Sequence, residues 1–332
     1  MVYRYKAVVA GVSLFMAPCA LYAAQIGGQE EFKGKLAKAI QEDLDVKVKA
    51  FVNAGVKRLA DTQDPAGYMY GPRFEKAKTY ILSTDITAID KRHTNGFTSL
   101  ICAASWNLPK TVQVLIDHKA NVDLQSEDDD LCAGSTAVVC AMDGYGDGIT
   151  EYMKVYDGKN AIRCNEQVVA QAKEDIVQSL IKANADLNIK NSIGITSLTK
   201  VVHVLRTRQD KLVKLLLDGK ADIGAASMDA FPDHSLLMSS IMSYEPKNGQ
   251  EDEKIRLVKL LVEAGADINK QDKNGCTFLM LLRYLSNTSP DALKLTNELS
   301  QYLISQGADT TLKNKQGTEE WIMPEDLGCV IN

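Results

Sequence analysis

Apolar residues recur every three or four positions along residues 254–263, and charged residues occupy the positions between them. The apolar positions are Ile255, Leu257, Val258, Leu260, Leu261 and Val262. This spacing predicts an amphipathic helix with one buried face. We expect the helix to end at Gly265, because a residue without Cβ readily takes the left-handed conformation that terminates a helix. An extended step at 266–269 then leads into a turn at 272–275.

The same order of helix, helix end and extended step recurs along the chain. Similar phrases lie at 115–124, 180–189, 216–223 and 303–312. A second segment, with a turn glycine, a hydroxyl residue and an aliphatic residue, recurs in register with these helices. Its copies are Gly96-Phe-Thr98-Ser-Leu100, Gly194-Ile-Thr196-Ser-Leu198 and Gly275-Cys-Thr277-Phe-Leu279, with weaker ones at 134–138 and 233–237. The glycine suits a turn, the hydroxyl can cap a helix, and the aliphatic side chain can pack between neighbouring units.

Five such units in register resemble ankyrin repeats, and the resemblance covers most of the chain from about Lys35 onward. The family's segment reads Gly-x-Thr-Pro-Leu-His-x-Ala-Ala, and its proline and histidine are missing from all five copies. The residues needed for the turn, the cap and the packing remain. The resemblance implies an all-α fold, an ankyrin-repeat solenoid of helix pairs joined by β-hairpin-like turns.

The resemblance also implies a layout for residues 25–332. It comprises an N-terminal capping repeat at about 35–56, a loop at 57–90, repeats at about 93–125, 126–190 with an insertion at 143–167, 191–224, 231–270 and 271–312, and a C-terminal cap at 313–332. Residues 57–90 depart from the pattern because Asp64-Pro65 and Gly71-Pro72 are expected to break helices. We expect a loop there, whose tyrosines either pack on the edge of the solenoid or form a contact surface.

Residues 1–24 have the features of a secretory signal peptide. Two basic residues precede a mostly apolar run at 7–17, and small residues follow, which favours cleavage after Ala23 or Ala24. A retained membrane anchor is the alternative, although the apolar run is shorter than the about 20 residues that span a bilayer. A lipoprotein anchored at Cys19 is a further alternative, which the preceding proline disfavours. We therefore expect a periplasmic or secreted protein.

Composition and charge limit the classes of partner that we expect. The chain has 332 residues, 45% hydrophobic and 24% charged, and 38 basic against 43 acidic residues give a net charge of −5. No block of lysine or arginine stands out, so nucleic acid is not an expected partner. Once the signal peptide is removed, no membrane partner is expected either, and the protein should be a monomer on its own.

No catalytic or metal-binding constellation is found. The chain has four histidines and lacks the Gly-x-Ser-x-Gly, phosphate-loop and His-Glu-x-x-His motifs. The acidic segment at 143–148 does not fit an EF-hand, because Tyr145 and Lys154 stand at the third and twelfth positions. No Cys-x-x-Cys pair or cysteine–histidine spacing suits zinc. We expect no cofactor, no metal and no catalytic residue.

Six cysteines remain after signal cleavage, and an exported chain permits disulfides. Cys102 and Cys140 occupy equivalent positions in adjacent inner helices, about 10 Å apart, which is too far for a disulfide. Cys132 and Cys164 flank the irregular repeat at 126–190. We expect Cys164 to pair with either Cys132 or Cys140 and to fasten the insertion.

Partner contacts in similar ankyrin proteins come from the turn residues beside the glycine and from the end of the inner helix. Carried onto this chain, those positions are Thr94, Asn95, Phe97, Ser105 and Trp106, then Ser192, Ile193, Ile195, His203 and Val204, then Lys273, Asn274 and Tyr284. Four of them are apolar where water favours polar side chains: Phe97, Trp106, Ile193 and Ile195. Such a row implies a protein partner. Alternatively, Trp106 and Ile195 fill gaps left by the missing proline and histidine.

These expectations combine into one functional hypothesis. The protein is a non-enzymatic, exported interaction module that binds a protein partner through turn tips and the concave face of the inner helices, and that masks or assists this partner. A secreted effector acting on host proteins is the second hypothesis. The third is an enzyme with its site in the 143–167 insertion, where Cys164 is the one candidate reactive group.

Overall fold

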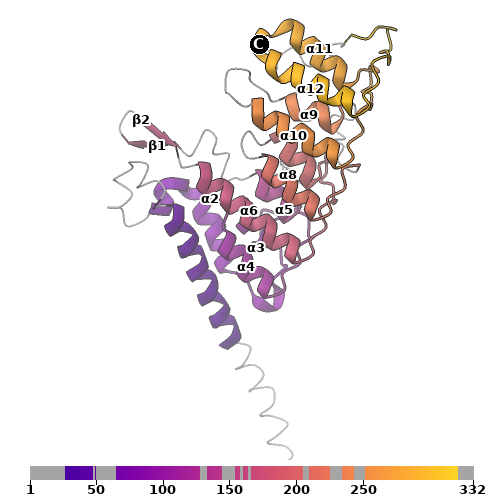
Figure 1. Ribbon diagram of the computed structural model, residues 1–332. Helices are drawn as coiled ribbons and strands as arrows, with labels where there is room; N and C mark the ends of the chain where they lie inside the picture. Colours follow the sequence, from indigo (N-terminus) through magenta and orange to yellow (C-terminus); the bar gives the residue numbers. More distant parts are fainter. Residues whose placement is uncertain are drawn as a thin grey trace, which may run out of the picture.

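The computed structural model describes residues 27–47, 49, 65–127, 133–143, 154–157, 160–163, 166–204, 209–224, 234–242 and 251–320. The helices form one elongated stack, which runs from the helix at 27–47 in indigo to the last pair in yellow (Figure 1). The turns that join the pairs follow one another along one edge of the stack (Figure 1). Residues 1–24, the expected signal peptide, lie outside the described residues. Among the described residues, no helix is long and apolar enough to cross a membrane.

Five helix pairs form two layers. The inner layer contains α3 (Ser99–Ser105), α5 (Ala137–Asp143), α7 (Ser197–Val204), α9 (Leu236–Met242) and α11 (Phe278–Thr288). The outer layer contains α4 (Pro109–Asp117), α6 (Glu166–Lys182), α8 (Gln209–Asp218), α10 (Glu251–Glu263) and α12 (Leu293–Ser305). Each inner helix packs on the next inner helix and each outer helix on the next outer helix. The expected all-α solenoid of helix pairs is confirmed.

The recurring sequence segment explains how each inner helix begins. The hydroxyl of the cap residue accepts a hydrogen bond from the amide three residues later, at 3.2 Å for Thr98 with Ile101 and 3.4 Å for Thr277 with Met280. Ser235 caps α9 in the same way, at 3.2 Å from the amide of Met238. These bonds satisfy amides that have no partner within the helix.

The core is continuous along the stack. One cluster of buried apolar side chains extends from Phe32 in the first helix to Leu303 in α12. In all five inner helices, the described residues of the first turn and a half are buried on every side. The inner helices therefore provide the packing between repeats, and their initial turns are not a surface.

Asp and Asn side chains join successive repeats through the extended step that follows each outer helix. In each case one Oδ1 accepts the backbone amide of the next repeat: Asp90 from Asn121 at 2.8 Å, Asp123 from Asp186 at 2.8 Å, Asn188 from Asp222 at 2.7 Å, and Asn269 from Asp309 at 2.8 Å. We call this series the Asx ladder. It gives a physical role to the repeated Ala-Asp/Asn-x-Asn/Asp phrase of the sequence, since a hydrogen bond contributes about 1 kcal/mol.

The N-terminal capping unit differs from the expected one. Residues 27–47 form a single helix that lies along α4, with the Phe32 ring 4.7 Å from that of His118 at one end. At the other end, the Asp43 carboxylate accepts the amides of Lys110 and Thr111, each at 3.0 Å. This helix therefore runs antiparallel to α4 in the outer layer. The expected helix pair of a capping repeat at about 35–56 is wrong over the described residues, because residues 35–47 belong to this one helix.

The expected loop at 57–90 is also wrong, because α2 (Pro65–Leu82) lies within it and packs on α3 in the inner layer. Pro65 occupies the first position of the helix, where the missing amide proton has no cost. Phe74, Ala77 and Ile81 form a buried face at helical spacing. Burying that face outweighs the penalty of the Gly71-Pro72 step. The first pair thus places its first helix outside and its second inside, the reverse of the five repeats.

The insertion in the second repeat contains an antiparallel hairpin that the sequence did not lead us to expect. Strands β1 (Lys154–Asp157) and β2 (Asn160–Arg163) pair from Lys154 opposite Arg163 to Asp157 opposite Asn160. The hairpin stands apart from the helices in Figure 1. Strands of four residues are too short for their alternation to be recognised against a background of tyrosines and glycines.

The cysteines are described only in part. Cys102 and Cys140 are buried on α3 and α5. Burial raises the pKa of Cys102 to about 12, so its thiol stays protonated. Cys132 and Cys164 lie outside the described residues. The pairing of Cys164 with Cys132 or Cys140 stays a prediction.

Candidate partner-binding surface

Three of the described turn tips are held in shape by an Asp or Asn side chain at their start: Asn191, Asp272 and Asn314. Asn191 Oδ1 accepts the amides of Ile193 and Ile195, at 3.1 and 2.8 Å. Asp272 Oδ1 does the same for Asn274 and Cys276, at 2.8 and 2.7 Å. The glycine of each turn has a positive φ, 78° at Gly194 and 77° at Gly275, which only glycine adopts without strain. The tips are therefore preorganised before any partner arrives.

Neighbouring tips are also bonded to each other. The amide of Ser192 donates to the carbonyl of Ala133 at 3.0 Å, and the amide of Lys315 donates to that of Asn274 at 2.8 Å. The side chains of Gln125 and Gln271 each bridge two carbonyls, and Gln125 joins Gly134 at 2.6 Å to Lys190 at 2.9 Å. We call the row of tips built in this way the turn edge. Over the described residues its tips form two bonded groups, one at 93–96, 126–135 and 190–195 and one at 271–276 and 313–318.

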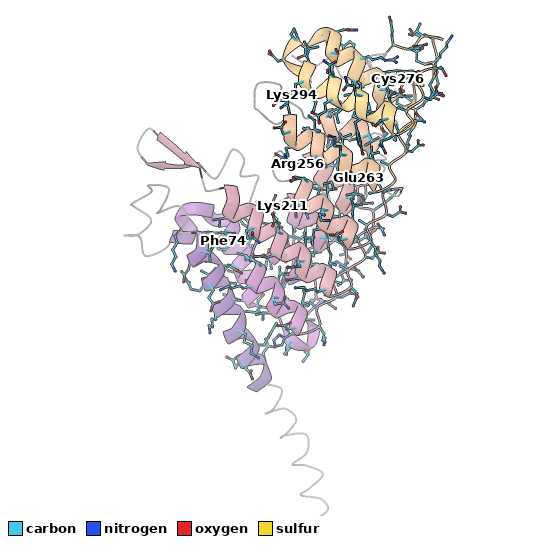
Figure 2. The ribbon with its side chains drawn as sticks, viewed as in Figure 1. Phe74, Lys211, Arg256, Glu263, Cys276 and Lys294 are labelled. Atoms are coloured by element: carbon cyan, nitrogen blue, oxygen red, sulfur yellow. The ribbon has the colours of Figure 1, made fainter. Side chains whose placement is uncertain are left out.

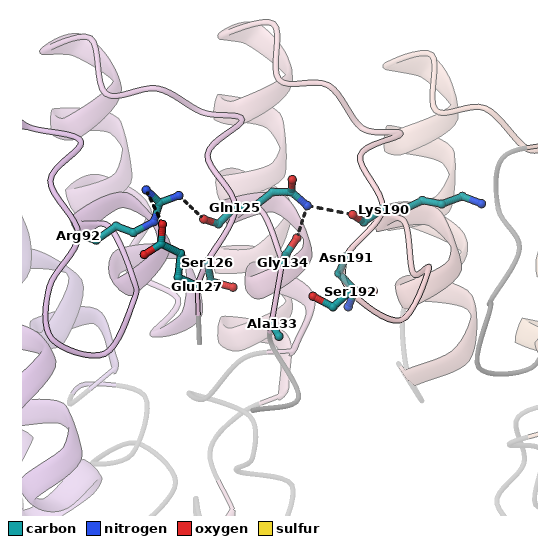
Figure 3. A pocket seen from close by; sticks show the side chains of 9 residues that line it. All are labelled: Arg92, Gln125, Ser126, Glu127, Ala133, Gly134, Lys190, Asn191 and Ser192. Carbon is teal, nitrogen blue, oxygen red and sulfur yellow. Dashed lines mark hydrogen bonds and ion pairs between the residues drawn. The ribbon is translucent and has the colours of Figure 1, made fainter. Parts of the chain in front are cut away.

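A polar hollow of about 410 Å³ lies in the turn edge between the first three tips (Figure 3). Arg92 reaches across it, with Nη2 donating to the carbonyl of Gln125 at 2.8 Å and Nη1 3.3 Å from the Glu127 carboxylate. On its far side Gly134, with φ 70°, approaches Ser192 so closely that an added Cβ would lie 2.7 Å from Oγ. The polar groups of the hollow thus hold the turns together.

Four of the expected contact residues are exposed on the turn edge: Thr94, Ser192, Ile193 and Lys273. The Ile193 side chain is 42% exposed, which is unusual for its type in this protein. The hydroxyl of Thr94 lies 2.6 Å from the phenol oxygen of Tyr80, which ties the first tip to α2. Asn95 and Asn274 are half-buried beside them. These six residues are accessible on the described tips, and their role in binding a partner stays a prediction.

Three other expected contact residues are buried, so their assignment to a binding surface is wrong. Phe97 and Ile195 are each 5% exposed, and Ser105 is 1% exposed. The two apolar residues follow the turn glycine, where the chain has already turned back toward the stack and the side chain enters the core. The Ser105 hydroxyl donates to the carbonyl of Cys102 at 2.9 Å. Burial of Ile195 agrees with the alternative that it fills space between repeats.

The expected residues at the ends of the inner helices are half-buried. Trp106 packs edge-on against Phe74 of α2 with ring centroids 5.2 Å apart, and its carbonyl accepts Lys47 Nζ at 2.8 Å. Tyr284 packs against the core at the edge of α11. Trp106 therefore fastens the N-terminal unit to the first repeat.

The end of α7 carries His203, which is half-buried. Burial lowers its pKa below the usual range, and the nearby cations Lys200, His234 and Lys254 lower it further. The side chain of Val204 lies outside the described residues. Because the initial turns of the inner helices are buried, the concave face that we expected to bind a partner is not open there. The turn edge is the accessible surface.

Within the described part of the chain, no group of three or more histidine, cysteine, aspartate or glutamate side chains could hold a metal ion. Most of the insertion at 143–167, including Cys164, lies outside that part. A candidate that sequence reasoning missed is Lys315 on the last tip, which is exposed. Its signal was available, because Lys315 stands at the position that Lys273 occupies in the preceding repeat.

Known sequences and structures with the same repeat are similar to this chain. The family described as Ankyrin repeat matches residues 95–127. A stretch of 62 residues, 18% of this chain, is 47% identical to Ankyrin repeat and SAM domain-containing protein 6 from Rattus norvegicus, and the match spans 6% of that protein.

Two solved structures are also similar. The ankyrin repeat domain of Bcl-3 matches with a TM-score of 0.47 and 21% identity, over 76% of this chain and 89% of that one. The ankyrin repeat protein EF0377 matches with a TM-score of 0.45 and 24% identity, over 71% of this chain and 92% of that one. The stretch at 95–127 holds the pair α3 and α4, and its turn, cap and ladder contacts recur in the later pairs.

Proposed function

Because the chain is an ankyrin-repeat protein, we propose that it is a non-enzymatic module that binds another protein through its turn edge. One observation carries this proposal: the described tips have exposed residues and are bonded to neighbouring tips, and those at 191–195 and 272–276 are preorganised by their own Asn and Asp side chains. Preorganised surfaces bind with less loss of conformational entropy than flexible loops. The buried initial turns of the inner helices leave the tips as the part of each repeat that a partner can contact.

The exposed Ile193 provides the sharpest test. We expect Ile193→Asp to weaken capture of the protein partner at least about tenfold, since a buried apolar anchor contributes more than about 1 kcal/mol to an interface. Ile304→Asp is the matched control, because Ile304 is 50% exposed on α12 in the outer layer and is not part of a tip. Affinity is measured by biolayer interferometry with the captured partner. If both variants weaken partner binding equally, or if neither weakens it, the turn edge is not the binding surface.

The compartment is the second part of the proposal. The features of a signal peptide in residues 1–24 support export, with a periplasmic protein that masks or assists its partner as the leading case. A pull-down from the envelope fraction with protein starting at Gln25 tests this, with mass spectrometry of the bound material. One stoichiometric envelope protein would support it. Recovery of the native protein from the medium, with no envelope partner, would favour the alternative of a secreted effector that binds host proteins.

The enzyme alternative places a reactive group in the 143–167 insertion. It predicts that Cys164→Ser abolishes function in reducing buffer while leaving stability intact. The interaction proposal predicts that partner capture by the same variant is unchanged in reducing buffer. The same variant thus separates the two classes of function.

A further inference from the structure

The helix at 27–47 and α2 together form an N-terminal unit that docks on α3 and α4 of the first repeat. His93, at the start of the first tip, lies inside this docking surface. Its ring stacks on that of Tyr80 in α2, with centroids 4.8 Å apart and an interplanar angle of 11°. Its Nε2 lies 2.8 Å from the Ser99 hydroxyl of α3, which is bonded in turn to the hydroxyl of Thr84 just after α2. His93 therefore connects the tip to both helices.

The N-terminal unit covers the end of the stack at which the turn edge begins. Tyr80 contacts the first tip a second time, because its phenol oxygen lies 2.6 Å from the Thr94 hydroxyl. Gln29 of the first helix donates to the carbonyl of Thr84 at 2.8 Å, so that helix also reaches the loop after α2. Phe74 of α2 lies at the opposite end of the stack from Lys294 of α12 (Figure 2). A change in docking would therefore act on one end of the molecule.

The cations around His93 disfavour a positive charge on its ring. Burial lowers the pKa of His93 below the usual range, and Lys91 in the preceding loop lowers it further. On α2, the Lys76 ammonium lies 5.7 Å from the centroid of the Tyr80 ring on which His93 stacks. A second cation against the same ring would repel the first. Protonated His93 would thus share the docking surface with two lysines.

The carboxylates on the surrounding elements do not balance this charge. Each is within reach of another group: Glu30 with Lys33, Glu75 with Lys78, Glu127 with Arg92, Asp85 with Thr87, and Asp90 with the amide of Asn121. None of these described carboxylates contributes to the pKa of His93. A proton on the ring would therefore add an uncompensated charge to a half-buried site.

His118, the other histidine at this docking surface, has different surroundings. Its ring lies 4.7 Å from that of Phe32, and its Nδ1 lies 2.7 Å from the carbonyl oxygen of Val114. Glu31 of the first helix has a lowered pKa, caused mainly by Lys35 and to a smaller extent by His118. A positive charge on His118 is thus attracted by a carboxylate of the N-terminal unit, whereas one on His93 faces lysines.

We propose that His93 is a proton-sensitive contact: its protonation loosens the N-terminal unit from the first repeat and uncovers the first tip at Thr94. The neutral ring can accept the Ser99 hydroxyl and stack on Tyr80, whereas a charged ring loses hydration beside Lys91. Because docking disfavours the proton, the undocked form binds it more readily. Docking is therefore complete above the ordinary histidine pKa of about 6.5 and weakens as pH falls below it. This device goes beyond the proposed function and does not depend on a partner.

Hydrogen exchange on the full chain tests the device, with α12 as an internal reference at the other end of the stack. Protection factors of the amides at 74–84 are corrected for the intrinsic exchange rate and compared at pH 7.5 and pH 5.5. With a pKa of about 6.5 in the undocked form, the loss at pH 5.5 cannot exceed about tenfold. We expect wild-type protection at 74–84 to fall about threefold to tenfold relative to α12. His93→Gln should limit this fall to less than about twofold, because glutamine does not titrate.

Two further variants control the result. His118→Gln makes the same substitution at the same docking surface and should keep the wild-type fall. Lys91→Gln changes an exposed side chain and should reduce the fall, because it removes a charge that opposes the proton on His93. This variant decides the matter if His93→Gln is already undocked at pH 7.5.

An equal fall in wild type and His93→Gln, or no fall in wild type, would overturn the inference. A fall that disappears in His118→Gln and persists in His93→Gln would assign the effect to the other histidine and overturn it as well. An unchanged fall in Lys91→Gln would reject the charge argument on which the inference rests.

Discussion

At the scale of single residues, the fold depends on a few positions where backbone and side chain must meet closely. Gly134 is one of them, because it has φ 70° and lies against Ser192 of the next tip. Gly265 has φ 95° but has no atom within 4 Å of an added Cβ. The two glycines share a backbone requirement and differ in their surroundings.

We expect Gly134→Ala to lower the free energy of unfolding by about 2 kcal/mol or more, since the strain of a positive φ and a Cβ contact of 2.7 Å both act against it. Gly265→Ala is the control and should cost about 1 kcal/mol, from backbone strain alone. Urea unfolding of both variants provides the measurement. Equal losses would show that the close approach of the first tips does not contribute to stability.

Which single side chains are buried was also the feature that the sequence predicted least well. The cap hydroxyls and turn glycines were identified, because their chemistry is local. The burial of the residues after each glycine was not predicted, because Phe97 and Ile195 differ from Ile193 only in the side of the turn on which they lie. That side is set by the backbone conformation at Gly96 and Gly194 and by contacts with the next repeat, which a single tip does not encode.

At the scale of elements, α7 carries a group that makes stability depend on pH. His203 has a lowered pKa in the folded protein, so the unfolded chain binds a proton more readily. The stability that neutral His203 contributes is therefore complete above the ordinary pKa of about 6.5 and is lost as pH falls below it. We expect the urea midpoint to fall between pH 7.5 and pH 5.5, and His203→Gln to reduce this fall. An equal fall in the variant would assign the pH dependence to other groups.

The N-terminal elements show how tertiary packing overrides local signals. Prolines at 65 and 72 favoured a loop, yet α2 forms because Phe74 and Ile81 bury a face against α3. The helix at 27–47 takes the outer position because Asp43 can cap α4 and Phe32 can pack on His118. Both contacts join residues more than 65 positions apart, so a local pattern could not predict them.

At the scale of the whole molecule, the stability of a solenoid is approximately a sum over repeats and the interfaces between neighbours. The Asx ladder contributes to these interfaces, and one step of it cannot form. Gly224 stands where Asp123, Asn188 and Asn269 stand in the other repeats, and it has no side chain to accept the amide of Asp267. The Asx ladder is therefore interrupted between repeats 191–224 and 231–270.

We expect Gly224→Asn to raise the free energy of unfolding by about 1 kcal/mol, from one restored hydrogen bond and a less flexible unfolded chain. The φ of Gly224 lies outside the left-handed region. An added Cβ would lie 3.2 Å from Asp222 Oδ1, a tight contact, but Asp123 and Asn188 occupy the equivalent place beside Asn121 and Asp186 in other repeats. Asn188→Ala is the converse change and should lose about as much. A neutral or destabilising Gly224→Asn would show that the ladder does not hold the repeats together.

The most direct test of a binding role for the turn edge is hydrogen exchange by mass spectrometry on the native partner complex. Amides of the tips at 191–194, 272–275 and 314–317 should exchange more slowly in the complex than in the free protein, while those of the outer helices α8 and α10 stay unchanged. This result would locate the partner on the turn edge. Protection confined to the outer helices, with the tips unchanged, would contradict the account.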